Sequence, residues 1–342
     1  MNKVQIKNSE NRKNLELNLG KVCNNRCIFC LDRNSPKSAR KWLPLKRAIE
    51  EMENARGSGI TSLGLLGGEP TAHPRIIEIV EYAKKLGFER IALATNGLKL
   101  SDLQFTERLI DAGVTRIGIS IHGHKPEIED YLSGRNGNFE KKFKAIKNLV
   151  KIKRDGKLRD NLSLNAVLTS YNFDKMPAFC AFFKKIGITD IRFNLIRTDS
   201  CMEKAKELTP RLSDISKQIL LTILANEKIL HIDLSFGDIP LCIYPTEILV
   251  SARLSSFYIG EMRDLDTSCA VFLSPDDASI EAQRFNWKER KTNALKIKSS
   301  VCAKCKISNI CEGIWRSYAE TYGTSELKSI NSLKNATKNG NE

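Results

Sequence analysis

The sequence predicts an α/β fold in which six strands form an open arc or incomplete barrel, followed by a small cysteine-rich domain. Strand and helix patterns alternate up to about residue 230. After residue 236 the alternation stops, and residues 237–324 hold five of the ten cysteines among short elements and turns. Alternating strands and helices of this length favour parallel strands with right-handed crossovers, whose carboxyl ends carry the functional loops.

Each element follows from local pattern. Apolar runs predict strands at 15–19, 60–66, 91–95, 116–121, 162–168 and 191–196. Helices are expected at 44–56, 74–86, 101–113, 139–154, 172–186 and 210–227, with Gly57, Gly87 and Gly113 at the ends of the first three. We therefore expect a core domain over 13–230 and a second domain over 231–324. Residues 325–342 are rich in Ser, Asn and Lys and read as a disordered tail.

Composition narrows the class of protein. The chain has 342 residues, of which 41% are hydrophobic and 28% charged, which excludes fibrous and wholly disordered classes. No apolar run approaches the roughly 18 residues that a membrane-spanning helix needs. The first twenty residues lack the apolar segment of a secretory signal, so a cytoplasmic location is expected. Ten cysteines in a reducing compartment favour metal or redox chemistry over disulfides.

The first cysteine cluster directly follows the first predicted strand. Cys23, Cys27 and Cys30 lie within eight residues, in a Cys-x3-Cys-x2-Cys spacing. Three soft thiolates on one loop suit an iron–sulfur cluster and leave one iron open for a small molecule. A structural zinc site would need a fourth ligand, and no Cys or His follows within about forty residues. Buried structural thiols are the remaining alternative.

These residues resemble the signature of the radical S-adenosylmethionine (SAM) superfamily, in which an aromatic residue such as Phe29 often precedes the last cysteine. Three further motifs occur in the same order as in that superfamily, each at the end of a predicted strand. They are Gly67-Gly68-Glu69-Pro70, Thr95-Asn96-Gly97 and Ser120-Ile121-His122-Gly123, and Asn165 on the fifth strand resembles a cofactor-contacting strand residue. Each is weak alone, but together they make the match specific.

The resemblance implies a partial (β/α)6 TIM-like barrel and a chemistry. Cys23, Cys27 and Cys30 would hold a catalytic [4Fe–4S] cluster that also binds SAM. An electron from flavodoxin or ferredoxin would cleave SAM, and the 5′-deoxyadenosyl radical would take a hydrogen atom from the substrate. The residues expected around the cofactor are Phe29, Gly67, Gly68, Glu69, Pro70, Thr95, Asn96, Ser120, His122 and Asn165. In the superfamily, the glutamate and exposed backbone of the GGEP segment hold the methionyl amino group.

A second cluster, Cys302, Cys305 and Cys311, lies in a lysine-rich segment. It resembles the SPASM or twitch extension of this superfamily, which carries an auxiliary [4Fe–4S] cluster, and the single trio favours the shorter twitch type. Cys242 is our expected fourth ligand because it follows a turn that leaves a strand, while Cys269 or an open position are alternatives. A zinc site made from the trio and one further cysteine is the competing interpretation.

The remaining cysteines and the charges carry less information. Cys180 is expected to be a core thiol, and Cys201 a loop residue near the barrel mouth. The net charge of +15 concentrates at 141–159 and 284–306, which indicates an anionic partner. The first stretch reads as the solvated face of a helix. Because no RNA-binding motif and few aromatic residues accompany these stretches, nucleic acid is not the expected partner.

Three functional hypotheses follow. The first is a radical SAM enzyme, an oxidoreductase that modifies a ribosomal peptide or protein side chain. The second is a radical SAM enzyme for a small molecule in cofactor or natural-product synthesis, similar to the enzymes that make the molybdopterin precursor. The third is a non-catalytic iron–sulfur or zinc protein that binds nucleic acid. The sequence leaves open the substrate, the atom attacked, the fate of SAM and the oligomeric state.

Overall fold

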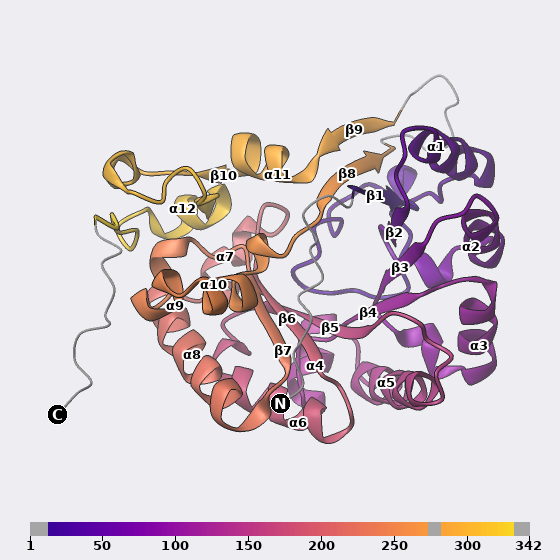
Figure 1. Ribbon diagram of the computed structural model, residues 1–342, viewed down its shortest axis with the longest axis horizontal. Coiled ribbons are helices and arrows are strands. Elements are labelled where there is room, and N and C mark those ends of the chain that lie inside the picture. Colours follow the sequence, from indigo (N-terminus) through magenta and orange to yellow (C-terminus); the bar gives the residue numbers. More distant parts are fainter. Residues whose placement is uncertain (1–12, 273–281, 332–342) are drawn as a thin grey trace.

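A computed structural model describes residues 13–272 and 282–331 of the chain. Within these ranges the main sheet contains nine strands in the order β7-β6-β5-β4-β3-β2-β1-β8-β9, which curve into the open arc of a partial barrel (Figure 1). Its strands are β1 (Lys13–Asn18), β2 (Ser62–Leu66), β3 (Arg90–Thr95), β4 (Arg116–Ser120), β5 (Leu162–Leu168), β6 (Asp190–Leu195), β7 (Asp233–Gly237), β8 (Asp266–Val271) and β9 (Gln283–Asn286). The predicted α/β class is confirmed.

Strands β1 to β7 pair in parallel with their sequence neighbours. The six strands predicted from the sequence are β1 to β6. The sheet then continues beyond the predicted core: β7 pairs with β6, and β8 pairs in parallel with the free side of β1. β9 turns back antiparallel to β8. Three strands that lie beyond residue 230 thus belong to the barrel sheet rather than to a separate layer.

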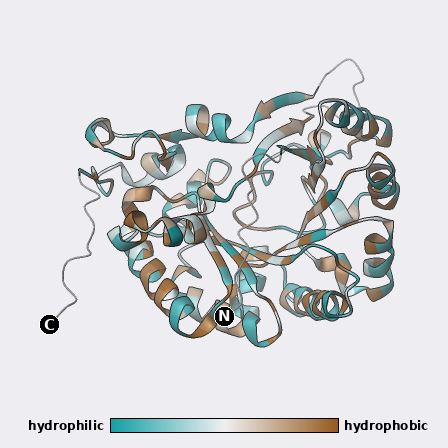
Figure 2. Ribbon diagram, in the orientation of Figure 1, coloured by the Kyte–Doolittle hydropathy of each residue, from teal (hydrophilic) through white to brown (hydrophobic). Residues whose placement is uncertain are grey.

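The helices that connect the parallel strands lie along the outside of the arc (Figure 1) and carry hydrophobic and hydrophilic residues around their circumference (Figure 2). They bury apolar side chains against the strands, as the periodicity requires. The α-helices of the described residues, including those of the C-terminal region, are α1 (Leu45–Gly57), α2 (Ile76–Lys85), α3 (Leu103–Ala112), α4 (Pro126–Ser133), α5 (Asn138–Arg154), α6 (Met176–Lys185), α7 (Ala205–Leu208), α8 (Leu212–Ala225), α9 (Thr246–Val250), α10 (Ala252–Tyr258), α11 (Trp287–Arg290) and α12 (Arg316–Tyr322). None of the described helices is long and apolar enough to span a membrane.

The cysteine-rich C-terminal region is small and packs onto the barrel. Its two short strands, β10 (Lys296–Ile297) and β11 (Ile314–Trp315), pair antiparallel. The Trp315 indole donates to the Leu195 carbonyl at the end of β6 (3.3 Å), and the Tyr318 hydroxyl accepts from the backbone of Leu212 (3.0 Å). This contact fixes the region beside the carboxyl end of β6.

The first residues of the predicted tail differ from the expectation of disorder. Leu327 is buried, and the Ile330 carbonyl accepts a hydrogen bond from the Lys306 backbone (3.0 Å). Low apolar content predicted disorder, but this segment is held by backbone hydrogen bonds rather than by a core of its own. Residues 332–342 of the predicted tail and 273–281 of the predicted second domain lie outside the described ranges.

Candidate active site

The loop after β1 carries the first three cysteines in consecutive tight turns. The Cys30 backbone donates to the Cys27 carbonyl (3.2 Å), and the Arg33 backbone donates to the Cys30 carbonyl (3.0 Å). The backbone amides of Arg26 and Ile28 reach the carbonyls that end α4, at 3.4 and 3.0 Å. Helix α4 therefore supports the loop from one side.

The three thiols are soft donors that share one loop. Cys23 is exposed, whereas Cys27 and Cys30 are half-buried. The Asn25 backbone donates to Cys23 Sγ (3.4 Å), and its side-chain amide donates to Cys27 Sγ (3.3 Å). Burial raises the pKa of the Cys27 thiol to about 12, so its proton would be lost only in exchange for a cation such as a metal. Because all three thiols leave one loop, the donor set fits a cluster with one open position.

Two glycines allow the turn after β2 to pack against this loop. Gly67 and Gly68 have left-handed φ values of 92° and 53°. A Cβ on Gly67 would lie 2.1 Å from Asn18 Oδ1, and a Cβ on Gly68 would lie 2.2 Å from the Val22 carbonyl. Gly67 therefore leaves room for the Asn18 side chain, and Gly68 permits contact with the backbone just before Cys23.

Gly68→Ala tests this packing. The new methyl group would be strained by the left-handed backbone and would clash with the Val22 carbonyl. We expect these two effects together to lower the free energy of unfolding by at least about 2 kcal/mol. Gly59→Ala is the matched control: Gly59 has φ 78° but no atom within 4 Å of a Cβ, and should cost only about 1 kcal/mol. Urea unfolding of both variants measures the difference, and equal losses would show that the packing against Val22 contributes nothing.

Glu69 joins the ends of β2 and β3 from a buried position. Its Oε1 accepts from Thr71 N (3.0 Å), Thr71 Oγ1 (2.5 Å) and Thr95 Oγ1 (2.5 Å), and its Oε2 accepts from Asn96 N (2.7 Å). Asn96 Nδ2 in turn donates to Asn24 Oδ1 (2.7 Å) in the cysteine loop. Pro70 begins the short helical turn after Glu69. The loops after β1, β2 and β3 thus interlock through one carboxylate.

The loop after β4 reaches the cysteine loop through aromatic contact. The ring of His122 meets the ring of Phe29 edge-on, with centroids 4.8 Å apart. His122 Nδ1 accepts from the Val167 backbone (3.1 Å), and burial lowers the pKa of this histidine well below its usual value. The imidazole is therefore neutral and acts as a hydrogen-bond acceptor toward β5.

A buried ion pair, missed by sequence analysis, holds the same loop from behind. Lys142 in α5 and Glu129 in α4 are both fully buried, with 2.6 Å between Lys142 Nζ and Glu129 Oε1. Lys142 also donates to the Ser120 carbonyl (2.8 Å), and Glu129 Oε2 accepts from His122 N (2.5 Å). The sequence did contain a pattern that predicts the burial of Lys142: at helical spacing it shares the apolar stripe of Phe139, Ile146 and Leu149.

Polar side chains line the inner face of the arc. Asn165 in β5 is exposed and accepts from the Asn194 side chain in β6 (2.6 Å). Glu16 in β1 lies opposite Cys269 in β8, with 3.6 Å between Cys269 Sγ and Glu16 Oε2. Cys180, by contrast, is fully buried among apolar side chains, which confirms a core thiol.

The second site brings four cysteines together. Cys242, Cys302, Cys305 and Cys311 line one pocket, together with Leu327 and Lys328. The Lys328 backbone donates to Cys242 Sγ (3.5 Å), and the Ile330 backbone donates to Cys305 Sγ (3.4 Å). The predicted fourth cysteine therefore lies beside the trio, whereas Cys269 is engaged elsewhere with Glu16. N–H groups aimed at sulfur are the environment that iron–sulfur and zinc thiolates share.

The first site agrees with a comparison of families. Residues 17–183 match the family described as "Radical SAM superfamily". This makes the chain a member of the radical SAM superfamily. The matched residues contain Cys23, Cys27 and Cys30, the loops after β1 to β4 and strand β5, all of which belong to the site described above.

Sequence relatives of this radical SAM chain match about half of it. The GTP 3′,8-cyclase of Aquifex aeolicus (strain VF5) is 31% identical over 189 residues, which are 53% of this chain and 55% of that protein. The chain thus spans little more than half the length of the curated relatives that it matches.

Solved structures match over a longer range. Streptococcus suis SuiB bound to S-adenosylmethionine has a TM-score of 0.61 at 17% identity, covering 94% of this chain and 76% of that chain. Native anSMEcpe with bound AdoMet has a TM-score of 0.64 at 19% identity, covering 94% and 93%. At these identities the likeness shows a shared fold.

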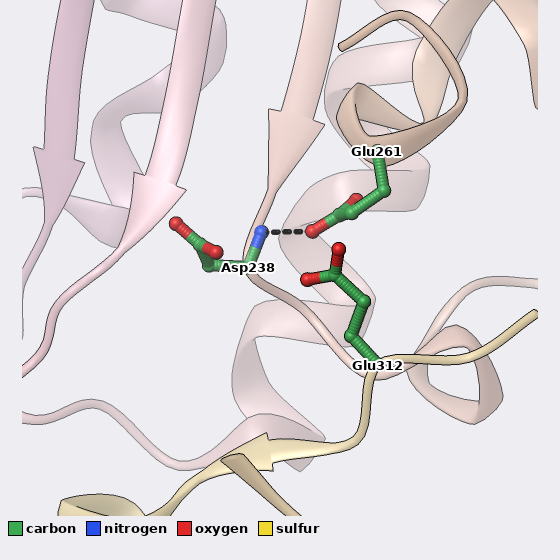
Figure 3. Close-up of side chains that lie close together, drawn as sticks. All are labelled: Asp238, Glu261 and Glu312. Atoms are coloured by element: carbon green, nitrogen blue, oxygen red, sulfur yellow. Dashed lines mark hydrogen bonds between the residues drawn. The ribbon is translucent and has the colours of Figure 1, made fainter. Parts of the chain in front are cut away.

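Three carboxylates between the radical SAM domain and the C-terminal region lie close enough to suggest a metal site, but two buried lysines form ion pairs with them. Asp238 follows β7, Glu261 follows α10 and Glu312 precedes β11 (Figure 3). Lys296 Nζ lies 3.1 Å from Asp238 Oδ1 and 2.8 Å from Glu312 Oε2. Lys291 Nζ lies 2.9 Å from the same Glu312 oxygen. The group is a buried ion-pair network that joins the cysteine-rich region to the barrel.

Proposed function

We propose that this protein is a radical SAM enzyme with an auxiliary iron–sulfur site, and that it modifies a peptide or protein side chain. When bound, the catalytic cluster and SAM supply reductive cleavage to a 5′-deoxyadenosyl radical that takes a hydrogen atom from the substrate. The observation that carries the proposal is the pairing of two thiol sites on one arc: the loop after β1, and the four-cysteine pocket beside the end of β6.

The chain's own residues would bind and orient the reactants. Cys23, Cys27 and Cys30 would hold the catalytic cluster. Glu69, Thr95 and Asn96 already hydrogen-bond one another, so their main role would be to fix the loops around SAM rather than to offer free acceptors. Ser120 and His122, at the end of β4, would lie beside SAM, and Asn165 would face the substrate from β5. Pre-formed loops of this kind lower the entropy lost on binding.

A peptide substrate is favoured by the extent of the structural likeness. SuiB and anSMEcpe match over almost the whole of this chain, including the cysteine-rich region, and both have been solved with peptides: precursor peptide SuiA and peptide Kp18Cys. Four thiols in one pocket would also leave no iron open for substrate. A closed cluster suits the transfer of electrons released by oxidation of a substrate carbon.

A small-molecule substrate is the second candidate, because the curated sequence relatives are GTP 3′,8-cyclases. Those matches cover only about half of either chain. Incubation of the reduced enzyme with GTP and SAM separates the two candidates. Conversion of GTP to a cyclised product would support the second, and unchanged GTP alongside SAM cleavage supports the first.

Anaerobic reconstitution tests the catalytic proposal. Protein loaded with iron and sulfide, reduced with dithionite and given SAM, is expected to form 5′-deoxyadenosine, measured by chromatography. Samples without dithionite and a reconstituted Cys27→Ala variant are the controls. If wild type forms no more 5′-deoxyadenosine than Cys27→Ala, the chain does not cleave SAM and a binding role must replace the enzymatic one.

Removal of two cysteines tests the auxiliary site separately. Reconstituted Cys302→Ala/Cys305→Ala should hold about four iron atoms per chain against about eight in wild type. It should still form 5′-deoxyadenosine, since the β1 loop is unchanged. Equal iron in both proteins, with zinc lost from the variant, would instead identify the pocket as a zinc site.

A further inference from the structure

Helix α8 carries large apolar side chains on two opposite sides. Its buried side faces the core and consists of Leu212, Ile215, Ile219, Thr222 and Ile223. On the opposite side, Leu220, Leu221 and Leu224 are 41%, 52% and 44% exposed. We call these three side chains the leucine face. The helix lies on the outer surface of the arc (Figure 1), and hydrophobic residues follow one another along it (Figure 2).

An outer helix does not ordinarily carry such a face. Helix α5, which also covers the outside of the sheet, has Lys144, Lys147 and Lys151 at its exposed positions. A helix that is apolar on all sides is typical of one that is buried on all sides, and a contiguous exposed apolar patch is typical of a contact surface. The leucine face therefore has the character of an interface rather than of a solvated surface.

The rest of the protein holds α8 in place and leaves this face outward. The Ser213 backbone donates to Glu326 Oε1 (3.0 Å), and the Ser216 hydroxyl donates to the Ile243 carbonyl (2.7 Å), one residue after Cys242. The C-terminal region is thus attached to the first two turns of the helix. A partner on the leucine face would meet an ordered helix and would lose little entropy to ordering it.

Charges at the two ends of the face indicate what covers it. Asp214 lies seven residues before Leu221, and Lys228 lies seven residues after it. Seven residues are about two helical turns, so the three side chains lie on the same side of the helix. The Asp214 side chain is 49% exposed beside Lys217 (3.6 Å), and Lys228 is exposed. Along the helix, this side therefore runs from an acid through a leucine to a base.

Such an order of charges is complementary to its own reverse. A second copy that packs antiparallel, about a two-fold axis at Leu221, would bring the partner's Lys228 to Asp214 and the partner's Asp214 to Lys228. The leucines would pack across the axis. A partner with charge of one sign, such as nucleic acid or an acidic protein, would instead meet an attractive charge at one end and a repulsive charge at the other.

We propose that the protein forms a homodimer through α8, with the leucine faces of two antiparallel helices packed around Leu221. One helix pair buries less than the roughly 800 Å² per partner of a standard stable complex, so the dimer should be weak, with a Kd on the order of 10 µM. The inference does not depend on SAM cleavage.

Charge reversal at either end of the face tests this arrangement. Asp214→Lys and Lys228→Asp each place like charges opposite one another at both ends of the interface. An equimolar mixture of the two variants restores opposite charges at both ends of a mixed dimer. The matched controls lie on α5: Glu140→Lys, which also changes an acid in the first turn of a helix, and Lys151→Asp, which changes an exposed lysine.

Sedimentation equilibrium of the full chain at low salt measures the dimer. Each single variant is expected to raise the Kd at least about tenfold, and the mixture should return to within about threefold of wild type. Both controls should match wild type. Leu221→Gln/Leu224→Gln, which removes the apolar contact, should also raise the Kd at least about tenfold, and urea unfolding establishes that each variant is folded.

The other outcomes would overturn the proposal. A wild type that stays monomeric up to about 100 µM forms no such dimer; if it bound phosphatidylglycerol vesicles that Leu221→Gln/Leu224→Gln did not bind, the leucine face would be a lipid contact instead. A dimer unchanged in Leu221→Gln/Leu224→Gln would use another surface. Single variants that weaken the dimer without recovery in the mixture would exclude the antiparallel arrangement. A dimer without 5′-deoxyadenosine formation would leave this inference standing and overturn only the proposed function.

Discussion

Cys27→Ala is expected to lower the rate of 5′-deoxyadenosine formation by more than about 100-fold. Mutation of a residue that merely supports a metal ligand already lowers activity by up to about 100-fold, and Cys27 would be a ligand itself. Cys27 is the middle thiol of the β1 loop, and its sulfur accepts a hydrogen bond from the Asn25 amide. Without it, two thiols remain on the loop, Cys23 and Cys30. Iron per chain, the visible absorption of the reconstituted protein and product by chromatography measure the result.

Cys180→Ala is the control for this variant. It also removes one thiol, but from the buried face of α6, and should retain both iron and product at wild-type levels per folded protein. If Cys27→Ala keeps a full complement of iron and its activity, the β1 loop does not hold the catalytic cluster.

Lys142→Met is expected to lower the free energy of unfolding by about 3–5 kcal/mol, because it leaves the Glu129 carboxylate buried without its cation. The loop after β4 should loosen with it, since Lys142 also holds the Ser120 carbonyl. Urea unfolding of the cluster-free protein measures the loss.

Two further variants isolate the ion pair. Lys144→Met removes an exposed lysine from the same helix and should change stability by no more than about 0.5 kcal/mol. Lys142→Met/Glu129→Gln removes both charges, keeps an acceptor for the His122 amide and should lose less than Lys142→Met alone. A double variant that loses the sum of its parts would show that the two side chains do not act as a pair.

Local pattern was sufficient to predict the first six strands, since each is an apolar run flanked by a helix with clear ends. Strand β8 was not predicted, because Asp266–Val271 has little apolar pattern of its own and becomes a strand by pairing with β1. The burial of Lys142 was not predicted for a related reason. A count of charges along residues 141–159 ignores the side of the helix on which each side chain lies. Of that stretch, Lys142 alone among its described lysines and arginines is fully buried.

The two cysteine sites likewise differ in how far the sequence predicts them, because one depends on local spacing and the other on contacts between distant segments. The spacing of Cys23, Cys27 and Cys30 is local, so the sequence alone places three donors on one loop. The proximity of Cys242 to Cys302, Cys305 and Cys311 depends on how distant segments pack. The sequence therefore favoured Cys242 as fourth ligand but left Cys269 and an open position as alternatives. The hydrogen bonds from the Lys328 and Ile330 amides to the cysteine sulfurs could not be predicted, because the composition of their segment indicated disorder.

The pairing of β8 with β1 has a consequence for how the chain is made. Asn14 and Thr267 face one another across these strands although 253 residues separate them. During synthesis one side of β1 therefore stays unpaired until nearly four-fifths of the chain has left the ribosome, and an open strand edge invites pairing with other chains. Closing so long a loop is slow. Production of the protein would accordingly benefit from slow translation, low temperature and chaperones that shield strand edges.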